Sequence, residues 1–250
     1  MVDKLELRIK SSDKNTNNIV PNGKVDENFK QGSTGDCWLL AAVKAITLEP
    51  KGQKILDDAI KVDDKGNVTV FLKGVNKKYT FTPAEIGQNT QMSKGDLDVR
   101  AIEMAIDKYF NEQKGVSGFL NRGDFSGGFS INDGNSSHVA FELLTGKGGR
   151  NVFGNTVGRA KDIIITDNDI DQYNKPNRVT CVANSLKGKD LNFTDGNGNK
   201  QTLYRKHVYS VHSSDDKNVY VINPWDTSKI ISVPRETFKK FFNTVDQVDL

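Results

Sequence analysis

The sequence predicts an α+β protein in which a helical part precedes a part built from antiparallel strands. Two segments, residues 36–49 and 97–110, have apolar side chains at helical spacing or on almost every side. Short apolar runs separated by Asp, Gly and Asn appear only after about residue 150. Helices first and strands second are typical of the α+β class and suggest two lobes.

In the first part, Pro50 and Gly52 end the first helix, and Gly74 forms the turn of a short strand pair. Residues 114–136 are rich in glycine and are expected to form a long loop. We divide the chain into an irregular N-terminal arm, a helical lobe and a β lobe, which span residues 1–25, 26–150 and 151–250.

In the second part, each strand is expected where a short apolar run lies between turn residues. Asp195-Gly196-Asn197-Gly198 is expected to be a hairpin turn. A last short helix opens at Pro234 and continues to about Phe242. The expected strands cover residues 163–165, 179–183, 208–211, 219–222 and 230–233.

Size and charge exclude several classes of protein. The chain has 250 residues, enough for a full core, and a formal net charge of +3 with both signs interspersed. No basic block indicates nucleic-acid binding, and no apolar run approaches the ~20 residues that cross a bilayer. The N-terminus lacks the apolar core of a signal peptide. We therefore expect no nucleic-acid or membrane partner and favour a cytoplasmic location; the oligomeric state is not indicated.

The residues that carry chemistry are a cysteine, a histidine and an asparagine, in that order along the chain. Cys37 opens the first helix, whose N-terminal dipole favours a thiolate, and His207 and Asn223 follow much later. Asn223 is expected to orient the imidazole of His207, which takes the thiol proton. The Gln31 amide and the Cys37 backbone N–H are candidate donors to an oxyanion. Gly32 is expected to let the backbone approach the substrate closely.

These residues resemble the catalytic signature of calpain-type cysteine proteases. The matching motifs are Gln-Gly-x-x-Gly-Asp-Cys-Trp-Leu-Leu-Ala-Ala from Gln31, His-x-Tyr-Ser-Val from His207, and Asn-Pro-Trp from Asn223. Weaker similarity covers residues 101–106, 126–128 and 144–146. The resemblance implies a papain-like fold with two lobes, catalytic roles for Cys37, His207, Asn223 and Gln31, and substrate contacts by Gly127, Gly128, Trp38, Lys206 and Trp225. Trp225 would also shield the histidine–asparagine pair from water.

The chain departs from the family in two places. Lys206 stands where the family has glycine before the histidine, which changes the charge or width of the substrate cleft. The family also binds calcium in each lobe, and Glu103 matches a ligand of the first site, whereas Asn28 replaces an acid there. The acidic loop of the second site is replaced from Thr227 onward. The triad chemistry requires no cofactor, and calcium dependence is left open.

The resemblance therefore predicts a cysteine endopeptidase that acts on proteins or peptides through a thioester on Cys37. Three other functions remain open. The chain could be an autoprocessing domain of a larger protein, a thiol acyltransferase, or a binding module that has kept the protease fold without activity. The sequence does not predict the cleavage specificity or the natural substrate.

Overall fold

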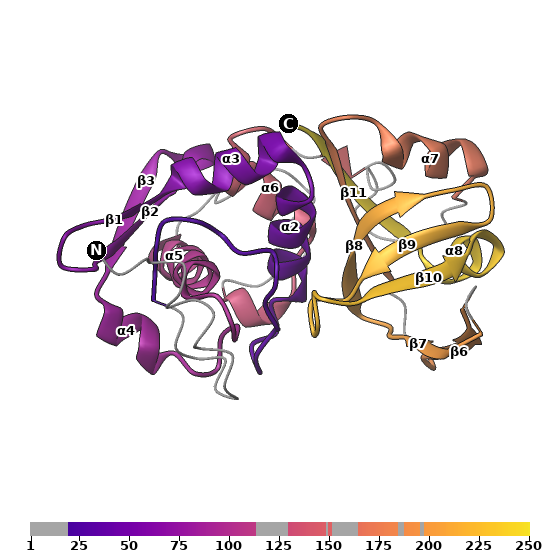
Figure 1. Ribbon diagram of the computed structural model, residues 1–250, viewed down its shortest axis with the longest axis horizontal. Helices are drawn as coiled ribbons and strands as arrows, with labels where there is room; N and C mark the ends of the chain where they lie inside the picture. Colours follow the sequence, from indigo (N-terminus) through magenta and orange to yellow (C-terminus); the bar gives the residue numbers. More distant parts are fainter. Residues whose placement is uncertain (1–19, 114–129, 149, 152–164, 185–187, 196–197) are drawn as a thin grey trace, which may run out of the picture.

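A computed structural model of the chain describes residues 20–113, 130–148, 150–151, 165–184, 188–195 and 198–250. Helices and sheets are mixed, with most helical residues in the first part and most strand residues in the second (Figure 1). This arrangement is consistent with the predicted α+β class. Within the described ranges no helix is long and apolar enough to cross a membrane.

The helical part begins with α2 (Cys37–Thr47), which is buried along its whole length after the first residue. Its apolar side chains point in every direction, so the helix is surrounded by other elements rather than exposed on one face. As expected, it ends before Pro50. The chain then forms a second helix, α3 (Pro50–Ala59), which the sequence analysis missed. Proline is favourable at the first position of a helix, where its missing N–H costs nothing.

A small antiparallel sheet and three more helices complete this part. The sheet contains β1 (Ile60–Val62), β2 (Val68–Leu72) and β3 (Lys77–Phe81), of which the last two were predicted. The 3-10 turn at Lys73–Val75 joins them, and another lies at Ile131–Asp133. The helices are α4 (Pro83–Gln88), α5 (Leu97–Gln113) and α6 (Ser137–Thr145).

The second part contains a six-stranded sheet with the strand order β10-β9-β8-β5-β11-β4, and all neighbours are antiparallel. Its strands are β4 (Arg150–Asn151), β5 (Arg178–Asn184), β8 (His207–Ser214), β9 (Asn218–Ile222), β10 (Ile230–Pro234) and β11 (Thr244–Asp249). A separate hairpin consists of β6 (Leu191–Thr194) and β7 (Lys200–Leu203), on either side of the predicted turn.

Strand β11 was not predicted, because it places polar residues in the interior. Asp246 and Gln247 are both buried, so the strand does not read as an apolar run. The carboxylate of Asp246 accepts hydrogen bonds from the Ser136 hydroxyl and the Ser137 backbone N–H. These bonds satisfy Oδ2 of the buried carboxylate and join β11 to the start of α6, while His138 Nδ1 lies 3.6 Å from Oδ1.

Both faces of the large sheet are covered. Val179 and Cys181 on β5 and Val208 on β8 belong to a hydrophobic cluster shared with α2, α5 and α6. The alternate residues Val182 and Tyr209 point to the opposite face, into a second cluster that includes Phe238 of α8 (Arg235–Phe241). The period of two in a strand produces this division. Figure 1 shows α2 and α6 on one side of the sheet and α8 on the other.

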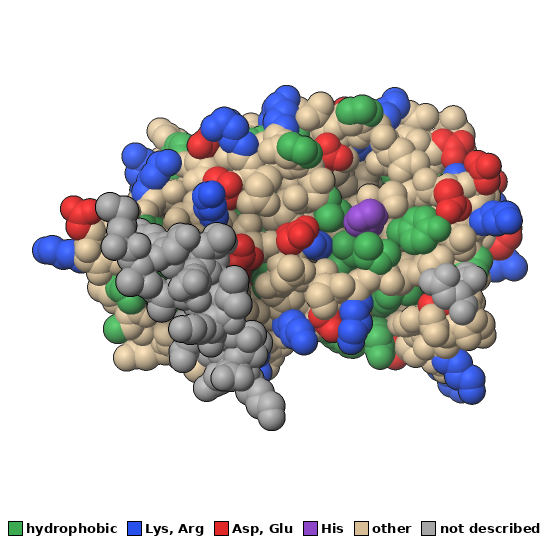
Figure 2. All heavy atoms as spheres, viewed as in Figure 1, with side chains coloured by type: hydrophobic (Ala, Val, Ile, Leu, Met, Phe, Trp, Pro, Cys, Tyr) green, Lys and Arg blue, Asp and Glu red, His purple; other side chains and the backbone are tan. Residues whose placement is uncertain are grey.

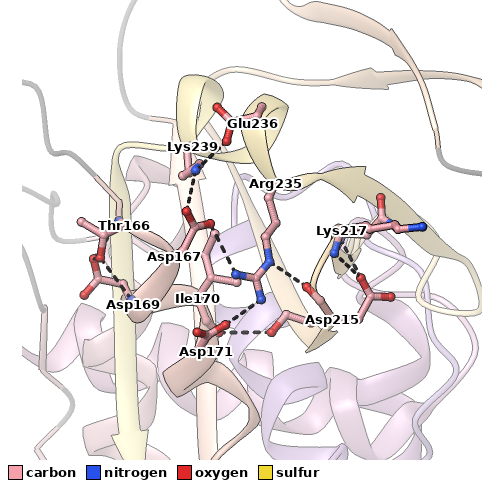
Figure 3. Close-up of polar contacts among 12 residues, drawn as sticks. Thr166, Asp167, Asp169, Ile170, Asp171, Asp215, Lys217, Arg235, Glu236 and Lys239 are labelled. Carbon is pink, nitrogen blue, oxygen red and sulfur yellow. Dashed lines mark hydrogen bonds and ion pairs between the residues drawn. The ribbon is translucent and has the colours of Figure 1, made fainter.

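An ion-pair network anchors α8 against α7 (Asp167–Asp171) (Figure 3). Arg235 pairs with Asp171 at 2.6 Å and with Asp167 at 3.4 Å, and its Nε donates to the carbonyl of Asp215 in the turn after β8. Ile165, part of an expected strand, instead precedes α7 as a buried residue outside any strand, whereas Ile163 and Ile164 lie outside the described residues. A 3-10 turn at Gln172–Asn174 follows α7.

Candidate active site

The candidate nucleophile, Cys37, is the first residue of α2 and is half-buried. Its thiol forms a hydrogen bond with the backbone of Val208, the residue that follows His207 in β8. One turn further along α2, the Ser210 hydroxyl donates to the Ala41 carbonyl at 2.8 Å in the interior. Packing of α2 against β8 therefore brings the cysteine and histidine motifs together across 170 residues of chain.

The histidine and asparagine are directly bonded. His207 Nε2 lies 2.8 Å from Asn223 Oδ1, which also accepts the backbone N–H of Trp225 at 2.9 Å. Two donors converge on this one atom of the side-chain amide, so it is the oxygen. His207 must then donate through Nε2–H, and its Nδ1 carries the lone pair when the ring is neutral. The expected orienting contact of Asn223 is present in the structure.

Three aromatic side chains surround the imidazole of His207, which is only 5% exposed. The Trp225 ring lies 4.5 Å from the imidazole, centroid to centroid, and Tyr204 packs on Trp225 at the same distance. Tyr209 presents its edge at 5.1 Å, and its hydroxyl accepts the backbone N–H of Tyr204. The rings exclude water from the histidine, which is the shielding role that the resemblance implies for Trp225.

Burial leaves both reactive groups neutral at rest. It raises the pKa of the Cys37 thiol to about 11, with a further rise from the charge of Asp36. It lowers the pKa of His207 to about 4, although the hydrogen bond to Asn223 acts in the opposite direction. We expected the helix terminus to lower the pKa of the thiol; desolvation outweighs that effect here. A thiolate and an imidazolium would therefore have to form together, because each charge compensates the other.

The loop before the cysteine is held by its own chain. A Cβ on Gly32 would lie 2.1 Å from the carbonyl oxygen of Gln91, and one on Gly35 would lie 2.7 Å from that of Asn132. Only glycine fits such approaches. The close approach expected between Gly32 and a substrate is thus a contact with the chain itself.

Gln31 lies in this loop, but both of its amide N–H groups are engaged. Nε2 donates to the Thr34 carbonyl at 2.7 Å and to Asp36 Oδ1 at 3.2 Å, while Oε1 is buried without a hydrogen-bond partner. Donation to an oxyanion would require the release of one N–H. The backbone N–H of Gln31 donates to the Pro224 carbonyl at 2.8 Å, so this loop is joined to the Asn-Pro-Trp segment.

Thr227 makes a second connection between these two segments, and no motif in the sequence predicts it. Its hydroxyl accepts the Phe29 backbone N–H at 2.8 Å and lies 2.7 Å from the Phe29 carbonyl and 3.0 Å from that of Glu27. The side chain is 2% exposed. Where the family has an acidic loop, this chain uses a buried threonine to fix the position of the loop that follows Asn223.

Glu103, the expected calcium ligand, is enclosed in the interior. Its carboxyl accepts the Ser93 backbone N–H at 3.0 Å and the Ser93 hydroxyl, and it hydrogen bonds with the carboxyl of Asp36. Burial raises the pKa of both acids, that of Asp36 to about 6; the contact between them lowers the pKa of Asp36 and raises that of Glu103, so the proton of the pair lies on Glu103. Asn28 is exposed, and the described residues contain no group of three or more His, Cys, Asp or Glu that could hold a metal. These residues do not fit an oxygen cage for calcium.

The other expected substrate contacts have different environments. Trp38 is fully buried, its indole N–H donates to the Ile131 carbonyl, and its ring stacks on Phe110. Its side chain is therefore part of the core and does not line a substrate surface, which corrects the expectation.

Lys206 and Trp225 are exposed beside the histidine. Lys206 adopts a φ of +52°, the left-handed conformation that glycine favours, which explains why glycine suits this position. Gly127 and Gly128 lie outside the described residues.

The family comparison agrees with the sequence motifs. Residues 7–80 match the family model described as calpain family cysteine protease. This match supports a calpain-type protease domain. The match supports a cysteine-protease-like function and includes Gln31 and Cys37, whereas His207 and Asn223 lie beyond it. A search of the curated proteins finds no match.

Proposed function

We propose that this chain is a cysteine endopeptidase of the calpain type, which hydrolyses peptide bonds in proteins or peptides. Cys37 is the nucleophile, His207 the general base and acid, and Asn223 the residue that orients the histidine. The contact that carries the proposal is the hydrogen bond of 2.8 Å between His207 and Asn223, next to a thiol that bonds the backbone of Val208. The match to the calpain family over residues 7–80 supports it independently.

The chemistry follows from the neutral resting state. The Cys37 thiol transfers its proton to Nδ1 of His207 as sulfur attacks the substrate carbonyl carbon, and the resulting oxyanion accepts the Cys37 backbone N–H. Gln31 contributes a second donor after one amide N–H leaves Thr34 or Asp36. The imidazolium then protonates the leaving nitrogen, the C–N bond breaks, and a thioester remains. Water, deprotonated by His207, hydrolyses the thioester and regenerates the thiol.

We further propose a papain-like arrangement, with a helical lobe at residues 26–150, a β lobe at residues 151–250 and an arm at residues 1–25. The separate hydrophobic clusters support this division, since one centres on the helices and the other on the sheet and α8. Cys37 and His207 would then face each other from the two lobes. A groove between lobes suits an extended substrate backbone.

A second candidate function is a binding module that keeps the fold without catalysis. Two observations favour it: burial raises the pKa of the Cys37 thiol to about 11, and both N–H groups of the Gln31 side chain are engaged. Both describe a site that must change before it reacts. The experiment below separates this candidate from the endopeptidase.

The test measures cleavage of quenched fluorogenic peptides by the full chain and by Cys37→Ser. Cys181→Ser is the matched control, because Cys181 is the other cysteine of the chain and is buried in the core at 1% exposure. We expect Cys37→Ser to abolish cleavage and Cys181→Ser to retain it. Full cleavage by Cys37→Ser would overturn the proposal. Product analysis with an added amine would reveal acyl transfer, and cleavage confined to the chain's own parent protein would indicate autoprocessing.

A further inference from the structure

A hollow of about 530 Å³ lies next to Asn223 and Trp225, the two residues that contact the imidazole of His207. It is lined by Asn223 and Trp225 of the proposed site, by Lys200 at the start of β7 and Tyr204 just after its end, and by Ile230 at the start of β10. Cys37 does not line it. A volume of this size lies within the range of ordinary ligand pockets.

The lining of this hollow is mixed, and its apolar part includes two large side chains that are exposed. Among the described residues, the exposed large hydrophobic side chains are Val20, Trp225 and Ile230. Two of these three, Trp225 at 45% and Ile230 at 51% exposure, border the same hollow. Figure 2 shows hydrophobic side chains next to charged ones in the region around β9 and β10. Exposed apolar side chains gathered in one concave place indicate a binding surface.

The rim of the hollow carries an unbalanced positive charge. Asp226 is neutralised by Lys229 at 2.9 Å and lies 3.9 Å from Lys30. Lys200 is exposed and has no ion-pair partner within the described part of the chain. An occupant with a carboxylate near Lys200 would supply the missing charge.

Position decides which part of a substrate reaches the hollow. The general acid must contact the leaving nitrogen, so the substrate residues after the scissile bond run past His207. Trp225 packs against His207, and Tyr204 packs against Trp225, each at 4.5 Å between centroids with the rings tilted. The hollow begins at these two rings. It therefore continues the proposed site on its leaving-group side.

We propose that this hollow binds the segment after the scissile bond and selects a bulky apolar residue followed by an acidic residue. The apolar side chain packs on Trp225 and Ile230, and the carboxylate pairs with Lys200. This proposal rests on the proposed endopeptidase function, because it assigns the hollow to the substrate of that reaction.

The test compares fluorogenic peptides that are identical before the scissile bond and carry Leu-Glu, Leu-Lys or Ala-Glu after it. We expect kcat/KM to be about fivefold higher for Leu-Glu than for Leu-Lys, as for a rim charge pair. Lys200→Glu should reverse that order, and Ile230→Ser should abolish the preference for Leu-Glu over Ala-Glu. Lys65→Glu is the matched control, since Lys65 is exposed in the turn between β1 and β2 and should leave both ratios unchanged. Equal rates for all three peptides would overturn the proposal.

A binding measurement keeps the two proposals separate. Fluorescence anisotropy of the labelled peptides, mixed with the Cys37→Ser protein, measures their binding to the hollow without requiring cleavage. One outcome is that the wild type cleaves none of the peptides, while Lys200→Glu in the Cys37→Ser background reverses the binding preference. In that case the assignment of the hollow stands and the endopeptidase function fails. If binding is also indifferent to the peptide and to the charge of residue 200, the assignment of the hollow is wrong.

Discussion

Replacement of Asn223 by alanine tests how the histidine is positioned. The substitution removes the acceptor of two hydrogen bonds, at 2.8 Å from His207 Nε2 and at 2.9 Å from the Trp225 backbone N–H. Trp225 is 45% exposed, so water can replace the second bond, but His207 is 5% exposed and its N–H is left without a partner. An unsatisfied buried donor costs about 1–3 kcal/mol. We therefore expect kcat/KM to fall by a factor of about 5 to 150.

The assay is peptide cleavage between pH 4 and pH 9, together with thermal unfolding to show that the variant folds. Asn223→Asp is informative in the same series, because a carboxylate beside His207 raises the pKa of the imidazole and should move the acid limb of the profile to higher pH. Asn111→Ala, an exposed asparagine on α5, is the control. If Asn223→Ala keeps kcat/KM within a factor of about two while cleavage still requires Cys37, the positioning role is refuted.

Three further predictions concern stability, pH and metal. Lys206→Gly should raise the melting temperature by about 2–4 °C in thermal unfolding, since it relieves a left-handed backbone (φ +52°); a lower melting temperature would contradict this. Burial and the charge of Asp98 raise the pKa of Asp96 to about 8, so its contribution to stability is full below about pH 4 and is lost as the pH rises through 8. In denaturant unfolding, the free energy of unfolding of Asp96→Asn relative to wild type should therefore increase by more than about 1.4 kcal/mol between pH 5 and pH 9. A difference that stays constant with pH would argue against this reasoning. Chelation of calcium should leave cleavage at least partly intact, because Glu103 is enclosed by Ser93 and Asp36; complete loss that calcium restores would count against that view.

The sequence was sufficient to select the candidate catalytic residues. Cys37, His207 and Asn223 each lie within a short motif that requires a particular neighbour, so local order along the chain identifies them. The structure brings His207 and Asn223 into contact and places the thiol against the next residue, Val208. The first helix and most strands were also predicted, since their periodicity is a local property.

Long-range packing decided what periodicity could not. Strand β11 was not predicted, because Asp246 and Gln247 are buried polar residues whose hydrogen-bond partners lie on elements distant in the sequence. Trp38 follows the candidate nucleophile directly, but its side chain is fully buried in the core. Thr227 joins the loop after Asn223 to Phe29, a contact across almost 200 residues that no sequence window contains.

The electrostatic state of the site also depended on tertiary structure. The start of a helix favours a thiolate, and the sequence predicts that much about Cys37. Desolvation acts in the opposite direction and raises the pKa of the thiol to about 11. The chain alone thus specified which residues are the candidates for the chemistry. How much water surrounds them, and which carboxyls share a proton beside them, followed from the way that α2 packs against the sheet.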